Sequence, residues 1–226
     1  MDRIFVSLDL ETTGLDPRED EIIEIGAVKF QGREIIDTFH SLVDPHRPLA
    51  YFTRLLTTIS QEEEDSAPPF SGVSGELAAF IGHCPIVGHG VSFDLDFLSS
   101  KGIALSNQVY DTFELSSILL SNIPDHTLAT VARVLGVYCP REHRALTHAM
   151  VTMEVFLDLL ERASGLELAI ISEINRITAD TNWPFRSLFL DIERAASLSP
   201  GVGVAGGEIL NISPEARREP LILTTR

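Results

Sequence analysis

The chain has 226 residues, of which 44% are hydrophobic and 22% are charged, and its formal net charge is −16 with a sequence pI of about 4.7. This length suits one domain of ordinary size, or one domain with an appendage, and the composition excludes wholesale disorder. The acidity argues against broad, nonspecific binding of duplex nucleic acid, which needs a basic surface, although bound divalent cations can reverse the charge locally.

The sequence shows neither a signal peptide nor a membrane span. The start, MDRIFVSLDLETTG, lacks the basic region and long apolar run of a signal peptide. No apolar stretch reaches the roughly 18 residues that a membrane span requires. Cys84 and Cys139 lack the spacing of metal ligands, which favours free thiols in a reducing compartment. We therefore expect a cytoplasmic protein that does not act at a membrane.

Alternating apolar residues predict three N-terminal strands in an antiparallel meander. Over residues 3–11, RIFVSLDLE, the alternation places Asp9 and Glu11 on one face at the C-terminal end of a strand. Residues 21–30 and 34–43 flank the turn sequence QGR, which predicts a hairpin.

Helical and strand patterns then alternate up to residue 163. Helices are expected over 48–60 and 72–83 around a loop rich in Pro and Ser, over 92–102 with Ser92 as N-cap and Gly102 as its stop, over 126–137 and over 145–163. A buried strand is expected over 85–89, and a strand that runs into a helix over 107–120. This order predicts an α/β domain with a mixed sheet and helices on its faces.

The C-terminal part has a different pattern. We expect a domain over 1–163, an appended helical segment over 164–200, and a Gly- and Pro-rich tail or truncated linker over 201–226.

Three sets of residues can carry chemistry, and each also has a purely structural explanation. Asp9 and Glu11 would repel each other unless a cation lies between them, but they could simply be an acidic, solvated strand end. Asp94 lies where a buried strand gives way to a helix, but an acid there also complements the helix dipole. His143 can accept a proton from water near neutral pH, but exposed loop histidines are common.

Taken together, DLETTGLDP, GHGVSFDLDFL and HRALTHA resemble the three motifs of the DEDDh, or DnaQ-like, 3′–5′ exonucleases. The resemblance covers residues 1–163 and implies a ribonuclease-H-like fold: an α/β mixed central sheet with an antiparallel βββ meander plus parallel strands, flanked by helices. It also implies that Asp9, Glu11 and Asp94 hold two Mg²⁺ or Mn²⁺ ions and that His143 deprotonates the attacking water.

The resemblance further implies a substrate and the residues that bind it. The expected substrate is the 3′ end of single-stranded or frayed DNA, which would be cut into 5′-mononucleotides. The implied substrate-binding residues are Thr12, Thr13, Gly14, Ile59, His89 and Phe93.

The sequence departs from the family pattern at two positions, because His148 stands where the family has an aspartate and Gly90 where it commonly has an asparagine. Mg²⁺ prefers hard oxygen ligands, whereas neutral imidazole suits softer transition metals and brings no charge. No acid lies one helical turn from His148 to replace the missing carboxylate, and Glu142 or Asp111 would need a different backbone path. Gly90 lacks a side chain that could brace its loop.

Three interpretations of His148 are open. It can ligate a metal, which would give a site that prefers Mn²⁺ or a softer ion. It can leave the second metal position weak or empty. It can also be a deliberate substitution that abolishes activity. The protein would then be a weakened exonuclease, a catalytically inactive module that binds nucleic-acid ends, or a relative that trims RNA.

The C-terminal segment suggests possible partners. Residues 165–200, with NWPFRSLF, look like the segment that follows the exonuclease domain in DinG-type exonuclease–helicases. We therefore expect a helicase domain in the same longer chain or a polymerase assembly as the partner, with a self-contained exonuclease that ends in a disordered tail as the alternative.

Overall fold

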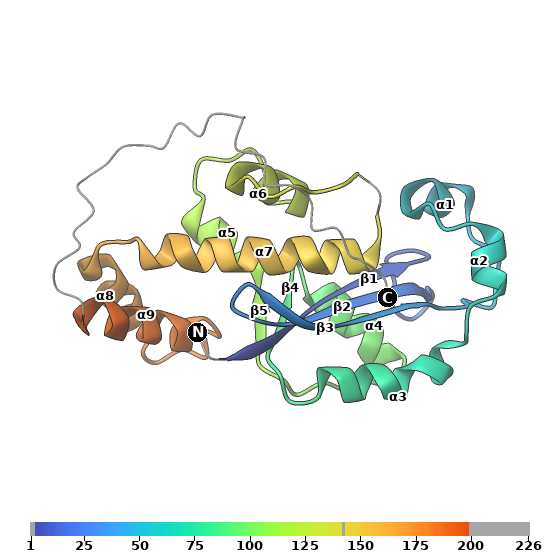
Figure 1. Cartoon of the computed structure of the whole chain (residues 1–226), viewed down its shortest axis with the longest axis horizontal. Helices are drawn as coiled ribbons and strands as arrows, with labels where there is room; N and C mark the ends of the chain where they lie inside the picture. Colours follow the sequence, from blue (N-terminus) through green and yellow to red (C-terminus); the bar gives the residue numbers. More distant parts are fainter. Residues whose placement is uncertain (1–2, 142, 199–226) are drawn as a thin grey trace.

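A five-stranded mixed sheet forms the centre of the molecule within the residues that the computed structural model describes, 3–141 and 143–198 (Figure 1). The strands are β1 (Ile4–Thr12), β2 (Ile22–Gln31), β3 (Glu34–Leu42), β4 (Ile86–Gly88) and β5 (Val109–Asp111). The first three form the predicted antiparallel meander, and β4 and β5 are parallel to β1, which gives the order β3-β2-β1-β4-β5. The predicted α/β fold with a mixed sheet is confirmed.

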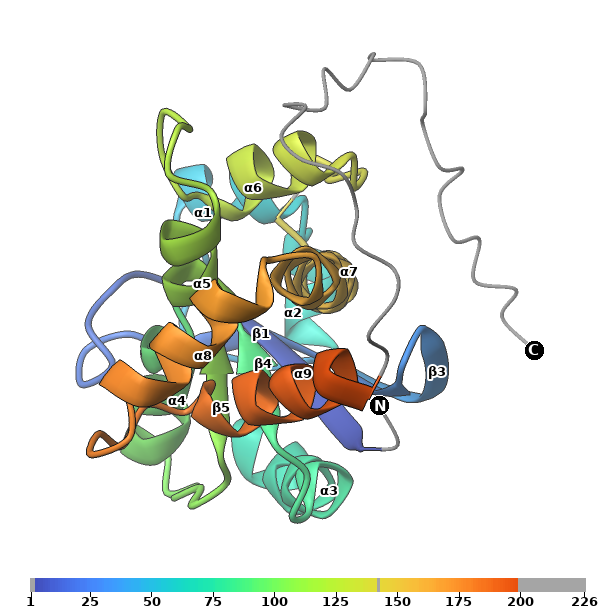
Figure 2. The same ribbon diagram turned by 90° about the vertical axis from the view of Figure 1, so that its left-hand side faces the viewer.

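Helices cover both faces of this sheet. In the described part of the chain they are α1 (Tyr51–Thr57), α2 (Gln61–Asp65), α3 (Phe70–Ile81), α4 (Ser92–Ser100), α5 (Thr112–Leu119), α6 (Leu128–Leu135), α7 (Ala145–Ser164), α8 (Leu168–Ile177) and α9 (Arg186–Leu198). Figures 1 and 2 show α7 along one face, with α5 and α6 beyond it, and α3 and α4 on the opposite face. None of the helices described here is long and apolar enough to cross a membrane.

The alternation of β1 divides its side chains between two cores. Phe5 packs against Phe156 of α7, with their ring centroids 5.3 Å apart. Val6, Leu8 and Leu10 point the other way, into the core shared with α3 and α4. Asp9 and Glu11 continue the Phe5 side of the strand, so they face the first turns of α7.

Two local predictions are wrong. Ser92 is not the N-cap of α4, because Val91 before it already has helical dihedral angles (φ −61°, ψ −17°) and Ser92 lies inside the helix. The stretch rich in Pro and Ser over residues 64–72, expected as a loop, is not all loop, because α2 ends at Asp65 and α3 begins at Phe70. Ser60 caps α2 through a reciprocal capping box with Glu63.

The helices α8 and α9 share the core of the sheet. Phe185, Leu188 and Phe189 are fully buried in the same cluster as Phe5. The division of the chain at residue 163 stays a prediction, and the expected tail, 201–226, lies outside the described residues.

Candidate active site

Asp9 and Glu11 lie beside a position where a helix touches the sheet directly. Across the β1–β2 pair, Asp9 is opposite Gly26 and Glu11 is opposite Glu24. A Cβ atom at Gly26 would lie 2.1 Å from the backbone nitrogen of Leu146, so only glycine allows α7 to approach this closely. This contact brings the first turn of α7, and with it residue 148, over the carboxylates of β1.

Asp94 reaches the same place from α4. The parallel pairing of β1 with β4 involves only Val6 and Ser7, so the later amides of β1 need other acceptors. The amide of Leu10 donates to Asp94 Oδ1 over 2.9 Å, and the Asp94 side chain is buried. Asp94 is therefore held against Leu10, the residue between Asp9 and Glu11, and it lies close enough to Asp9 for that carboxylate to raise its pKa.

Both histidines of HRALTHAM join this carboxylate group. His148 Nδ1 lies 3.6 Å from Asp9 Oδ2 and 3.5 Å from Glu11 Oε1. His143 Nδ1 lies 4.0 Å from Glu11 Oε1, and the two imidazole rings meet edge to face with centroids 5.2 Å apart. The structure thus brings together Asp9, Glu11, Asp94, His143 and His148.

Burial shapes the titration of every member of this group. Burial, and then the charge of Asp9, raises the pKa of Glu11 to about 8. Burial also raises the pKa of Asp9 and of Asp94 well above the usual range, and it lowers the pKa of both histidines. Without a bound cation, the site therefore disfavours the ionised form of its carboxyl groups. It also keeps the imidazoles of His143 and His148 neutral near pH 7.

One carboxylate oxygen of Asp9 suits a cation-binding site. Asp9 Oδ2 is buried and has no hydrogen-bond partner within the described residues. A buried carboxylate oxygen without a partner is costly, and a divalent cation is the partner that a cluster of carboxylates best accommodates. Asp9, Glu11 and Asp94 fit such an ion, whereas the single nitrogen of His148 fits Mg²⁺ poorly.

Glu24 supports the site in a way that the sequence interpretation missed. Its buried carboxylate accepts hydrogen bonds from Arg144 Nε (3.0 and 3.2 Å) and from the amide of Ala145 (3.1 Å), and it lies 2.7 Å from His40 Nε2. Burial raises the pKa of Glu24, but the bonds to His40, Arg144 and Ala145 outweigh this and lower it. Glu24 therefore anchors the start of α7 between the two site histidines. An acid inside the apolar run IIEIGAV was the signal that could have indicated this role.

Asp111 corrects the expectation about the Gly90 loop. Gly90 has a φ of +69°, which glycine adopts without strain, and its amide donates to Asp111 Oδ1 over 2.8 Å. The amides of Val91 and Phe113 also donate to Asp111. A neighbouring side chain therefore braces the loop, and Asp111 is committed to these amides rather than to the site. Glu142 lies outside the described residues.

The predicted substrate-binding residues fall into different environments. The turn at Thr12, Thr13 and Gly14 follows β1 directly, and Thr13 Oγ1 donates to Asp20 Oδ1 over 3.0 Å. Phe93 precedes Asp94 and packs against Phe97 with a centroid distance of 4.8 Å.

His89 and Ile59 are less available to a ligand. Both ring nitrogens of His89 are already paired, with Thr112 Oγ1 at 2.9 Å and with the carbonyl of His126 at 2.8 Å. Ile59 is only 2% exposed and packs in a small cluster with Ile23 and Leu49. Its burial leaves little of the side chain for a nucleotide, and its role stays a prediction.

Comparison with known proteins assigns the chain to a family. Residues 6–156 match the family described as exonuclease. The chain is 37% identical over 177 residues to the PolC-type DNA polymerase III of Caldanaerobacter subterraneus subsp. tengcongensis, and 38% identical over 181 residues to that of Thermotoga maritima. These matches cover 76% and 78% of this chain but only 13% of each polymerase.

Solved structures show the same fold. Exonuclease X in complex with 5′ overhanging duplex DNA has a TM-score of 0.59 at 24% identity, over 72% of this chain and 94% of that one. The nuclease domain of 3′hExo, a DEDDh family member bound to rAMP, has a TM-score of 0.62 at 22% identity, over 70% of this chain and 92% of that one. With the family match over residues 6–156 and the polymerase relatives, the conclusion is that this chain belongs to the DEDDh, or DnaQ-like, family of 3′–5′ exonucleases.

Proposed function

We propose that the chain acts as a two-metal-ion exonuclease that releases 5′-mononucleotides from single-stranded or frayed DNA 3′ ends, with Mg²⁺-dependent activity weakened by His148. The convergence of Asp9, Glu11 and Asp94 around a buried, unpartnered carboxylate oxygen carries this proposal. The two-metal count and the substrate go beyond the family assignment, so they need their own test.

Asp9, Glu11 and Asp94 would hold the divalent ions, and His148 would offer one further nitrogen. When bound, Mg²⁺ or Mn²⁺ supplies the positive charge that stabilises the attacking and leaving oxygens of a phosphodiester. Their charge also offsets the repulsion between DNA and a protein of net charge −16.

His143 is the residue that can move a proton. Its side chain is 49% exposed, so water reaches it, and burial followed by the nearby His148 lowers its pKa. A neutral imidazole near pH 7 can accept the proton of an attacking water molecule through its free nitrogen. The main chain at His143 is fixed beside α1, because the amide of His143 donates to the carbonyl of Leu56 over 3.0 Å.

The helix next to His143 favours unpaired bases as the substrate. Tyr51, Phe52 and Leu55 of α1 are 76%, 65% and 61% exposed. The carbonyl of Leu56, in the same helix, is the acceptor for the His143 amide, so these apolar side chains lie on the helix that borders the site. Aromatic side chains stack on bases that are free of a duplex.

The relatives suggest the context in which the domain works. Because similar sequences occur within PolC-type DNA polymerase III, a cytoplasmic polymerase assembly is one setting for this chain. A helicase domain in the same longer chain remains the alternative from the sequence of residues 165–200.

The proposal is tested by nucleotide release from a 3′-labelled single strand in Mg²⁺ and in Mn²⁺. His148→Asp is expected to raise the Mg²⁺-dependent rate at least about tenfold. A unit charge about 4 Å from an ion contributes up to about 4 kcal/mol at an effective dielectric near 20, and about 1.4 kcal/mol is already tenfold. His83→Asn, at an exposed histidine of the loop after α3, is the matched control and should leave the rate unchanged.

The variant Asp94→Asn tests whether Asp94 is a metal ligand of the proposed site. It should lower the rate at least about 100-fold, beyond the roughly 10- to 100-fold typical of residues that only support metal ligands. An unchanged rate in Asp94→Asn would contradict the proposed site. If the unaltered protein binds 3′ ends but releases no nucleotide in either metal, while His148→Asp does, the chain is the inactive end-binding module. The same assay on an RNA strand distinguishes the RNA-trimming alternative.

A further inference from the structure

Two imidazoles and one carboxylate converge at the start of α7. One ligand atom from each of Glu11, His143 and His148 lies within 4.8 Å of the other two. His148 Nδ1 lies 3.5 Å from Glu11 Oε1, and His143 Nδ1 is 4.0 Å from the same oxygen. Asp9 Oδ2, buried and unpartnered, lies 3.6 Å from His148 Nδ1 and points into this group.

This set of donors has the chemistry of a transition-metal site. Two histidines and one carboxylate are a ligand set of zinc enzymes, with bonds of about 2.0–2.2 Å. Tetrahedral bonds of that length separate ligand atoms by about 3.4 Å. The distances of 3.5 and 4.0 Å to the shared Glu11 oxygen lie near this separation, and all three ligand atoms lie within 4.8 Å of one another, so side-chain rotation can bring them onto one ion. An aspartate at position 148 would replace one of the two nitrogens by a hard oxygen, so the histidine creates the preference.

The place of His143 in this set has a consequence for catalysis. A neutral imidazole has one nitrogen that can accept a proton, and its other nitrogen carries a hydrogen. An ion bound to the free nitrogen of His143 therefore leaves the ring unable to accept a proton from water.

We propose that Glu11, His143 and His148 bind one zinc-type ion, such as Zn²⁺, Co²⁺ or Ni²⁺, and that this ion inhibits the nuclease by occupying His143. The ion site stands on the geometry alone, whereas its inhibitory effect rests on the proposed function. The two parts therefore need separate measurements.

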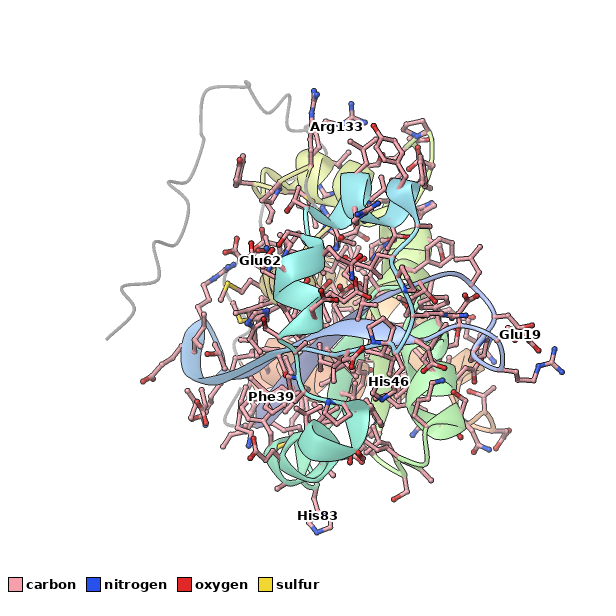
Figure 3. All side chains as sticks on the ribbon, turned by 90° about the vertical axis from the view of Figure 1, so that its right-hand side faces the viewer. Glu19, Phe39, His46, Glu62, His83 and Arg133 are labelled. Atoms are coloured by element: carbon pink, nitrogen blue, oxygen red, sulfur yellow. The ribbon has the colours of Figure 1, made fainter. Side chains whose placement is uncertain are left out.

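The ion site is tested by titrating the chelator-treated protein with Zn²⁺ in a calorimeter. One ion per chain is expected, with the affinity lowered at least about tenfold in His143→Ala and in His148→Ala, since even residues that only support ligands cost about 10- to 100-fold. His83→Asn is the control, because that histidine is exposed and projects away from the body of the protein, as Figure 3 shows. Circular dichroism establishes that each variant is folded.

Visible absorption of bound Co²⁺ provides a second readout, because the spectrum reports the ligands of the ion. The spectrum should change in both alanine variants and stay unchanged in His83→Asn. Equal Zn²⁺ affinity in the unaltered protein and in the folded alanine variants overturns the site. Loss of affinity in His148→Ala but not in His143→Ala overturns the role of His143.

Inhibition is measured separately, by adding Zn²⁺ to the protein while Mn²⁺ supports nucleotide release. The rate should fall along the same curve as Zn²⁺ binding and return when a chelator removes the Zn²⁺ and Mn²⁺ is restored. An unchanged rate at saturating Zn²⁺ overturns inhibition while leaving the ion site intact. If no metal supports nucleotide release, the proposed function fails, and the calorimetric titration still decides the ion site.

Discussion

At the residue scale, we propose that position 148 sets which ion the site prefers. Asp9, Glu11 and Asp94 offer hard carboxylate oxygens, and His148 adds a softer, neutral nitrogen within 3.6 Å of two of these side chains. Its lowered pKa, which burial causes, keeps that nitrogen free near pH 7. On the proposed function, this one side chain would shift the preference of the site from Mg²⁺ toward transition metals within an unchanged fold.

The titration of Glu11 predicts how the stability of the metal-free protein depends on pH. Its pKa rises from 4.5 to about 8 on folding, so the folded state holds this proton more tightly than the unfolded chain. The stability that Glu11 contributes is complete below about pH 4.5 and is lost as the pH rises through about 8. The raised pKa of Asp9 and of Asp94 acts in the same direction.

The two site histidines act in the opposite direction, but only below their unfolded pKa of 6.5, because the folded protein holds them neutral. The melting temperature of chelator-treated protein should therefore fall between pH 6.5 and about 8. Circular dichroism measures it, Glu11→Gln should show a weaker fall, and Mn²⁺ should oppose it. A melting temperature that rises over this interval would be inconsistent with the buried carboxylates described here.

At the scale of elements, the contact between β2 and the first turn of α7 assembles the site. Gly26 allows the close approach, and Glu24, two residues earlier on the same face of β2, binds Arg144 and the amide of Ala145. Because His143 and His148 flank these two contacts, the strand and the helix fix both histidines relative to Asp9 and Glu11.

A pair of glycine substitutions tests this contact. In Gly26→Ala the new Cβ would meet backbone atoms of Ala145 and Leu146 at 2.1–2.4 Å, so the free energy of unfolding should fall by about 1–3 kcal/mol or more, and nucleotide release should fall with it. Gly75→Ala, in the exposed face of α3, meets nothing within 4 Å in the described part of the chain. It should raise stability by about 0.5–1 kcal/mol. Denaturant unfolding measures both, and equal stabilities would show that α7 does not press on β2.

At the scale of the whole molecule, α8 and α9 extend the core past the end of the family match at residue 156. Trp183, the single tryptophan, has its ring centroid 5.2 Å from that of Phe189, and its Nε1 donates to Glu114 of α5 over 2.8 Å. Tyr110 of β5 contacts Phe185 edge to face at 5.2 Å. These contacts join the C-terminal helices to the sheet, so we expect them to unfold with it.

Phe189→Ala tests that expectation. Removal of this fully buried ring should lower the free energy of unfolding by about 3–5 kcal/mol, whereas Leu198→Ala, at a side chain that is 79% exposed, should change it by less than about 0.5 kcal/mol. Trp183 fluorescence reports the C-terminal helices, and circular dichroism reports the whole chain. Coincident transitions are expected. Two separate transitions would instead identify residues 164–200 as an independent appendage.

The sequence predicted the features that depend on local pattern. Alternation in β1 gives the shared face of Asp9 and Glu11, and the helix expected over 126–137 is present as α6, which ends at Gly136 in a left-handed conformation. The capping box that starts α2 was also local, but the neighbouring Pro- and Ser-rich stretch obscured it. The contacts of Glu24 with Arg144 and of Asp111 with Gly90 could not be assigned from pattern, because these partners lie 120 and 21 residues away along the chain.

The sequence by itself determined the strand order along the chain, most of the helices, the DEDDh motifs and the presence of a histidine at position 148, since each follows from the spacing and identity of residues close in the chain. Only the tertiary structure decided that both histidines share Glu11, that Gly26 admits α7 and that Asp111 braces the Gly90 loop. The physical reason is that these contacts join segments far apart in sequence, and their distances are set by how helix and sheet pack.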